Sequence, residues 1–276
     1  MVRIIRVFCF YDLRLPCRQN IDVMIILLSP SKNLHNVPKK AHRTSLPRFP
    51  EESQILIDNL RKLTPAKLQS LMDINDKLAK LNVSRYQQYH WPHTAEDATA
   101  AIYTFRGEVY LGFEANTTTE AQIEMADQRV RILSGLYGLL RPLDLIQPYR
   151  LEMGTELKIG KAKTLYDFWG SKITEMLNQD VEAANAKEII NLASQEYIAA
   201  IQPEKLNVPI IDIHFLEDRN GKLQFLSYNA KRSRGWVARY IVDNKIKKSS
   251  DLKGYLDHGY SYREELSEAK KLVFVR

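Results

Sequence analysis

The residues best able to bind a polyanion form a basic segment at positions 231–248. Seven lysines and arginines lie there, opposed by a single acidic residue, Asp243. Trp236 and Tyr240 lie inside the segment and Tyr228 lies just before it, so phosphate neutralisation and base stacking could occur on one face. The alternative is a solvated helix face with Trp236 turned into the core.

A second basic segment, Arg129–Gly154, has a backbone constrained by glycine and proline. Gly135 and Gly138 allow close backbone approach or a positive φ, whereas Pro142 and Pro148 prevent one continuous helix. The arginines of the segment should therefore occupy fixed corners, an arrangement typical of binding surfaces. A buried connection whose arginines satisfy nearby carbonyls is the alternative.

We expect basic residues from these and other segments to line one cleft that holds a nucleic-acid backbone. Such a cleft would bind through phosphate contacts and without sequence-specific readout. The predicted DNA-binding residues are Lys32, Asn75, Lys77, Arg141, Arg150, Lys161, Lys163, Lys231, Arg232, Arg234 and Arg239.

Asn75 belongs to a possible helix-hairpin-helix motif, which presents the backbone N–H groups of a tight hairpin to a DNA phosphate. The run from Leu68 to Ala79 has the apolar spacing of that motif, with Asp73 and Asn75 in place of its two glycines. Asn and Asp tolerate left-handed geometry better than other non-glycine residues. The usual proline is missing, and a plain helix pair with Asn75 as the cap of the second helix is the alternative.

Lys77 and Asp97 suggest an enzymatic alternative. Lyase-type DNA glycosylases of the helix-hairpin-helix class carry a nucleophilic lysine at the position of Lys77 and an aspartate about 20 residues later. A lysine that loses its proton beside an extruded nucleotide could attack the sugar and form a Schiff base. Lys77 would serve equally well as a phosphate contact, and Asp97 could oppose a helix dipole.

No metal or cofactor site is expected from the sequence. The six histidines lack a persuasive ligand spacing, and His90 and His93 have no acidic ligand nearby. Nucleotide-binding and nucleophile-elbow fingerprints are missing too. Ser194 and Glu196 follow a predicted strand and could line a small-ligand or iron-handling pocket; Ser194 could instead cap a helix.

The bulk composition is that of a globular protein with a sizeable core. The chain has 276 residues, of which 45% are hydrophobic, and a formal net charge of +7. The excess positive charge favours polyanionic partners. No apolar run is long enough to span a membrane.

The elements that must position these residues mix helices and strands without regular alternation. Strands are predicted at 24–28, 109–113, 189–192, 210–215, 223–228 and 272–275, with a hairpin turn at 218–221; helices are predicted from 51, from 65, at 165–177 and at 230–244. This pattern predicts a mixed α/β (α+β) fold in which helices wrap a mixed sheet.

Four motifs in order give the chain a family resemblance. They are SPSKNL at 29–34, the segment 129–154, NLASQEY at 191–197 and AKRSRGWVARYI at 230–241. With them the sequence resembles the YaaA peroxide-stress family from Met24 to about Phe274. The resemblance implies the fold called cantaloupe, a helix-hairpin-helix motif, and a cytoplasmic DNA-binding protein of the peroxide response that lowers damage from free iron.

The resemblance also suggests how the chain is divided. Residues 1–23 precede it and hold both cysteines, Cys9 and Cys17, so we expect them to be an extension outside the fold. Residues 24–276 should form a single compact domain, which is expected to act as a monomer on double-stranded or structurally distorted DNA. Because this part has no cysteine, a reducing cytoplasm is its expected location.

Overall fold

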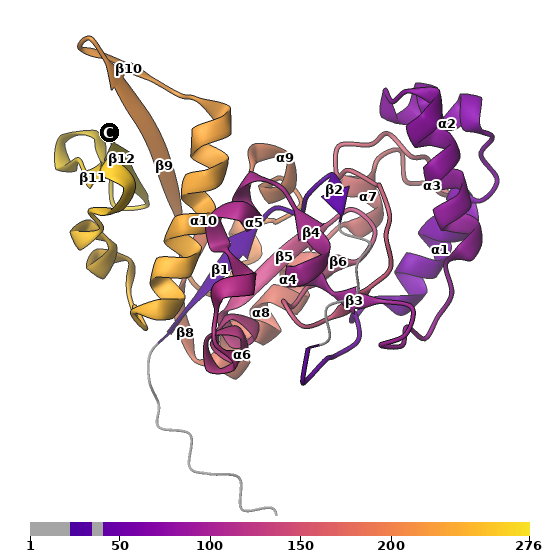
Figure 1. Cartoon of the computed structure of the whole chain (residues 1–276), viewed down its shortest axis with the longest axis horizontal. Helices are drawn as coiled ribbons and strands as arrows, with labels where there is room; N and C mark the ends of the chain where they lie inside the picture. The colour runs from indigo at the N-terminus through magenta and orange to yellow at the C-terminus, as the bar shows by residue number, and fades with distance from the viewer. Residues whose placement is uncertain (1–22, 35–40) are drawn as a thin grey trace, which may run out of the picture.

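The computed structural model describes residues 23–34 and 41–276, and most of the predicted extension lies outside them. Its central feature is an eight-stranded mixed sheet of order β11-β12-β9-β8-β1-β5-β6, with β10 paired to β9 (Figure 1). The strands of this sheet are β1 (Val23–Leu28), β5 (Val130–Ser134), β6 (Gly138–Leu140), β8 (Ala186–Leu192), β9 (Ile210–Arg219), β10 (Lys222–Gln224), β11 (Ser261–Tyr262) and β12 (Lys271–Val275). The prediction of a mixed α/β fold is therefore confirmed.

The apolar sequence of β1 explains its central place. Strand β1 pairs in parallel with β5 on one side and with β8 on the other. All of its residues from Met24 to Leu28 are fully buried, as expected for a parallel strand covered on both faces. β8, β9 and β12 continue the parallel order, whereas β6, β10 and β11 are antiparallel to their neighbours.

Helices cover the sheet, and smaller ladders join the loops between them (Figure 1). The α-helices are α1 (Pro50–Leu60), α2 (Pro65–Met72), α3 (Asp76–Gln88), α4 (Ala101–Thr104), α5 (Glu108–Phe113), α6 (Glu120–Arg129), α7 (Leu165–Trp169), α8 (Lys172–Ala184), α9 (Gln195–Ile198) and α10 (Ser227–Asp243). Short strands are β2 (Asn33–Leu34), β3 (Thr99–Ala100), β4 (Phe105–Arg106) and β7 (Leu145–Ile146), and 3₁₀ turns lie at Ala115–Thr117, Pro203–Lys205, Ser249–Gly254, Asp257–Gly259 and Glu264–Leu266. Among the described residues, no helix is both long and apolar enough to cross a membrane.

Two glycines let α5 and α10 pack in close contact. A Cβ placed on Gly235 would lie 1.9 Å from the carbonyl oxygen of Val109, and one on Gly112 would lie 2.3 Å from that of Arg232. The two backbones therefore approach more closely than any larger residue would allow. This contact fixes α10, which carries the basic segment, against α5 beside the sheet.

The prediction of a strand at Val109–Phe113 is wrong, because this run forms α5. A short apolar run does not distinguish a strand from a buried helix by periodicity alone. Two other boundaries also differ. The predicted helix 165–177 is divided at Gly170, which has a φ of 51°, and the predicted strand 223–228 ends at Gln224, after which α10 begins at Ser227.

The helix pair α2–α3 begins and ends where its capping residues require. Thr64 accepts a hydrogen bond from the N–H of Lys67, and Asp73 ends α2 in the left-handed conformation. The Asn75 side chain then accepts a hydrogen bond from the N–H of Leu78 and caps α3. Asp73 has the left-handed geometry expected at the first glycine position of a helix-hairpin-helix motif, but Asn75 at the second is extended, with a φ of −72°. The cap at Asn75 matches the alternative, a plain helix pair.

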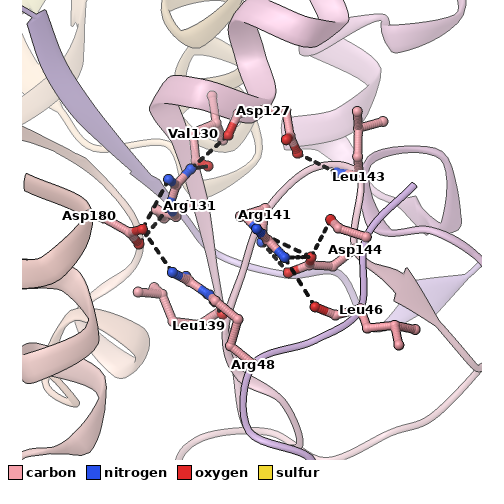
Figure 2. Close-up of polar contacts among 11 residues, drawn as sticks. Leu46, Arg48, Asp127, Val130, Arg131, Leu139, Arg141, Leu143, Asp144 and Asp180 are labelled. Atoms are coloured by element: carbon pink, nitrogen blue, oxygen red, sulfur yellow. Dashed lines mark hydrogen bonds and ion pairs between the residues drawn. The ribbon is translucent and has the colours of Figure 1, made fainter. Parts of the chain in front are cut away.

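The segment 129–154 is held in place by ion pairs, as Figure 2 shows. Asp180 of α8 accepts hydrogen bonds from Arg131 at 2.7 Å and from Arg48 at 2.8 Å. Burial alone would raise the pKa of Asp180, but the two guanidinium groups outweigh it and lower the pKa. This cluster ties α8 to β5 and to the loop before α1.

Candidate functional site

The polar residues of interest meet at the carboxyl ends of β1 and β8. From β1 the chain passes to β5 on one side of the sheet, and from β8 it passes to β9 on the other. In open α/β sheets, such a reversal of strand order leaves a crevice outside the carboxyl ends of the strands, where ligands bind. Ser29 follows β1 and Ser194 follows β8 at this point.

Ser29 and Ser194 join the two strand ends directly. The Ser194 N–H donates to the Ser29 hydroxyl at 2.8 Å, and that hydroxyl donates to the Ser194 hydroxyl at 3.3 Å. The hydroxyl of Tyr110 on α5 donates to the Ser29 carbonyl at 2.9 Å. Burial raises the pKa of Tyr110 well above its usual value, so its hydroxyl remains a neutral donor.

Charged side chains lie in the segments next to the two serines, with Lys32 three residues after Ser29 and Glu196 two residues after Ser194. One carboxylate oxygen of Glu152 forms an ion pair with Lys32 at 2.5 Å, and the other forms an ion pair with Arg150 at 2.7 Å. Glu196 accepts a hydrogen bond from the N–H of Gly154 at 3.1 Å. The Lys32 side chain is 60% exposed, so a ligand in solution could compete with Glu152 for it.

Arg232 and Arg234 both lie on α10, Arg232 near Glu108 of α5 and Arg234 near His214 of β9. Arg232 lies 3.8 Å from Glu108, which is too long for a hydrogen bond. Arg234 has no carboxylate within ion-pair distance in residues 23–34 and 41–276, and its Nε atom is buried without a partner there. Burial lowers the pKa of Arg234. Arg234 is thus a desolvated cation whose charge the described residues do not neutralise.

Three of the predicted DNA-binding arginines are engaged by the protein itself, and Arg150, paired with Glu152, is one of them. Arg141 binds Asp144 at 2.9 Å and donates to the carbonyl of Leu46, as Figure 2 shows. Arg239 binds Asp243 at 2.6 Å and also donates to the carbonyl of Phe113. Both guanidinium groups brace the fold. For Arg141 this matches the alternative considered for the arginines of segment 129–154, whereas Arg239 belongs to the basic segment 231–248.

The Trp236 ring is also engaged by another side chain of the protein. Its ring stacks on His258 with 3.6 Å between centroids and an interplanar angle of 13°. Tyr240 packs edge-on against Tyr255. Of the three aromatic residues predicted to stack on bases, only Tyr228 is strongly exposed, at 58%.

The remaining predicted lysines are exposed. Lys161 and Lys163 precede α7, and the hydroxyl of Tyr166 on that helix donates to the carbonyl of Glu196 at 2.8 Å. This contact places the lysine-bearing segment beside α9 and the two serines. Lys231 lies exposed on the second turn of α10.

The α2–α3 pair reaches the same region through Tyr86, whose hydroxyl donates to the carbonyl of Arg150. Lys77 and Asn75 are both exposed at the start of α3. Asp97 accepts hydrogen bonds from Thr94 at 2.6 Å and is tied also to a histidine and a glutamine. Its partners are thus other than Lys77.

The two histidines considered as metal ligands are held by the protein. His90 lies 3.0 Å from Asp97, which Gln147 also contacts at 3.1 Å. His93 turns away into the core, where its Nε2 lies 3.2 Å from the hydroxyl of Tyr137. The described residues contain no group of three or more histidine, cysteine, aspartate or glutamate side chains able to hold a metal ion.

Several site residues were missed from the sequence. Ser29, Tyr110 and Glu152 were not predicted, although Ser29 belongs to the SPSKNL motif directly after a predicted strand. A polar residue at the carboxyl end of a buried parallel strand was the available signal. The run that forms α5 was predicted as a strand, so the direction in which the Tyr110 side chain points could not be predicted.

The fold and the site define an α/β protein whose basic and polar residues gather at the topological switch point of a mostly parallel sheet. A comparison with protein families is consistent with this class. The family model described as "Peroxide stress protein YaaA" matches residues 24–266. The chain therefore belongs to the YaaA family of peroxide stress proteins.

Proposed function

We propose that this protein binds DNA without sequence specificity in the cytoplasmic response to peroxide, and that it thereby limits damage from free iron. Its membership of a peroxide stress family supports the physiological setting. The positive net charge of +7 supports a polyanionic partner.

One observation carries the proposal: contacts at the switch point join most of the cation-bearing elements into one continuous edge. Lys32 and Arg150 share Glu152, the segment at 150–154 contacts α3 and α9, and α9 contacts α7. Figure 1 places β2, α9, α7 and the α2–α3 pair together along the edge toward which the carboxyl end of β9 points. A DNA backbone laid along this edge would meet positive charge from several elements at once.

Arg234 adds a physical reason to expect an anion. A desolvated guanidinium without a carboxylate is costly to the folded protein, and a phosphate oxygen would satisfy it with a strong, charge-assisted hydrogen bond. The backbone N–H groups of the α2–α3 hairpin would contact a further phosphate, with Asn75 and Lys77 beside it.

Phosphate neutralisation also suggests how iron damage is limited. A protein that neutralises DNA phosphates releases the cations condensed around them. Ferrous iron is such a cation, and its reaction with peroxide produces radicals at the place where it is bound. Displacing it from the backbone would move that reaction away from the DNA.

The salt dependence of binding to a short duplex tests the proposal. We expect log K to fall linearly with log salt concentration, and expect Lys161→Gln with Lys163→Gln to reduce that slope by about 2. Lys187→Gln is the matched control, because Lys187 lies at the amino end of β8, on the opposite edge of the sheet. An affinity that does not change with salt would refute the electrostatic mechanism.

The iron effect needs a separate experiment. We expect saturating protein to reduce strand breaks in duplex DNA exposed to ferrous iron and peroxide, and the Lys161→Gln, Lys163→Gln variant to protect less at equal concentration. The Lys187→Gln variant also loses a lysine but should still bind DNA. A difference in protection between the two variants is therefore due to DNA binding and not to general radical scavenging. Equal protection by all three proteins would contradict a role for phosphate contacts.

A further inference from the structure

The hairpin formed by β9 and β10 projects from the body of the molecule beside the start of α10 (Figure 1). Asn220 and Gly221 form its turn with φ values of 57° and 77°, as a two-residue hairpin turn of the primed type requires. Asp218 accepts a hydrogen bond from the Gly221 N–H at 2.7 Å. The turn is therefore well defined although it is exposed.

The base of this hairpin is fixed to the body. Glu217 accepts hydrogen bonds from Arg276, at 2.8 Å, and from Asn229 of α10. Burial alone would raise the pKa of Glu217, but these hydrogen bonds outweigh it and lower the pKa. The hairpin is thus held in one direction relative to β12 and α10.

Exposed apolar side chains gather at this projection. Leu223 is 45% exposed, and Phe225 and Tyr228 are each 58% exposed. Phe225 and Tyr228 are the only aromatic residues among the large, strongly exposed apolar side chains of the described residues. The hairpin is fixed in place and exposes these aromatic rings to water, which is unfavourable. Exposed apolar groups of this kind indicate a binding surface.

Positive charge accompanies the rings. Lys222 lies opposite Arg219 on the hairpin, although Arg219 also pairs with Glu217 at 3.6 Å. Lys231 lies three residues after Tyr228 on α10, on the same side of the helix. Aromatic rings interleaved with lysine and arginine are typical of surfaces that bind unpaired nucleic-acid bases. Protein-binding patches, by contrast, are depleted in lysine.

We propose that the hairpin stacks Phe225 and Tyr228 on unpaired bases, so that the protein prefers DNA with a bulge or a single-stranded junction over intact duplex. This inference rests on the proposed DNA binding and adds the class of DNA. The cations Lys222 and Lys231 hold the adjoining phosphates. Any base can stack on an aromatic ring, so the preference follows DNA shape rather than sequence.

The test compares a plain duplex with the same duplex carrying a three-nucleotide bulge that contains 2-aminopurine. We expect wild-type protein to bind the bulged DNA more tightly and to change the 2-aminopurine fluorescence. Phe225→Ala with Tyr228→Ala should weaken binding to bulged DNA by about tenfold or more and abolish the fluorescence change. Its affinity for the plain duplex should remain unchanged.

Leu256→Ala is the matched control, because Leu256 is also an exposed apolar residue, at 74%, and should behave as wild type. Circular dichroism confirms that each variant is folded. An unchanged bulge preference in the double variant would overturn the stacking proposal while leaving DNA binding intact. A wild-type protein that binds neither DNA would refute both proposals, and a wild-type dimer that the double variant converts to monomer would identify the hairpin as a self-association surface instead.

Discussion

Arg234 combines two properties that rarely occur together, a desolvated guanidinium and the lack of a carboxylate partner among the described residues. Such a residue lowers the stability of the folded protein unless a ligand compensates its charge. Evolution tends to retain destabilising residues where function needs them. The stability and the DNA affinity should therefore change in opposite directions when Arg234 is replaced.

We predict that Arg234→Met raises the free energy of unfolding by on the order of 1 kcal/mol, and weakens duplex binding about tenfold. Methionine retains the apolar stem but removes the charge. Urea denaturation and fluorescence anisotropy measure the two effects. A variant that loses both stability and affinity would show instead that the Arg234 guanidinium supports the fold.

His93 gives the protein a pH-dependent stability. Burial is the main reason why its pKa falls from 6.5 to about 4. The unfolded chain takes up a proton below pH 6.5, whereas folded His93 does so only near pH 4. Its stabilising contribution is therefore complete above pH 6.5 and is lost as the pH falls toward 4.

We predict that the free energy of unfolding decreases between pH 7 and pH 4 partly through His93, by on the order of 3 kcal/mol. His93→Phe keeps an aromatic ring in the core and should remove that part of the pH dependence. Chemical denaturation at several pH values measures it, with the exposed His42→Phe as control. Parallel pH profiles for wild type and His93→Phe would contradict the prediction.

At the scale of the elements, the contact between α5 and α10 is the most constrained packing in the fold. Gly235 lies so close to α5 that an added methyl group would overlap both a carbonyl oxygen and the Phe113 nitrogen, which would lie 2.7 Å away. Because both atoms belong to the backbone, no side-chain movement relieves the overlap. The two helices must separate.

Gly235→Ala should therefore destabilise the protein by about 3 kcal/mol. Thermal denaturation followed by circular dichroism measures the loss. Gly254→Ala is the matched control, since no heavy atom lies within 4 Å of a Cβ at that position. Equal melting temperatures for the two variants would show that α10 shifts freely along α5.

The elements also show what could be predicted from the sequence. Asn75 caps α3 as expected, because capping depends on residues only three positions apart. The pairs Arg141–Asp144 and Arg239–Asp243 are equally local. The engagement of Arg141 by the protein was considered as an alternative, but that of Arg239 was not predicted. The contact between Ser29 and Ser194 joins residues 165 positions apart, and nothing local encodes it. Local signals thus gave most elements, while the site required the topology.

At the scale of the whole molecule, the enzymatic alternative depends on where the fold places Lys77 and Asp97. A lysine nucleophile needs burial or a cationic neighbour to lose its proton near neutral pH. Lys77 is exposed at the start of α3, and Asp97 is held by Thr94 and His90. Lys77 and Asp97, the two residues that the lyase alternative needs, therefore form no contact with each other in the described part of the chain.

We predict that borohydride traps no covalent complex between this protein and duplexes containing an abasic or oxidised site. A lyase would form a reducible Schiff base, which denaturing electrophoresis detects. A lyase-type glycosylase run in parallel confirms that the DNA substrates are competent. A trapped band that disappears in Lys77→Gln would establish the enzymatic alternative.

The position of β1 has a consequence for how the chain is made. This strand lies inside the sheet and is translated before both of its neighbours, β5 and β8, which begin only at Val130 and Ala186. Until then its apolar run has no partner, and contacts so distant along the chain form slowly. Nascent molecules should therefore depend on chaperones until β8 has emerged.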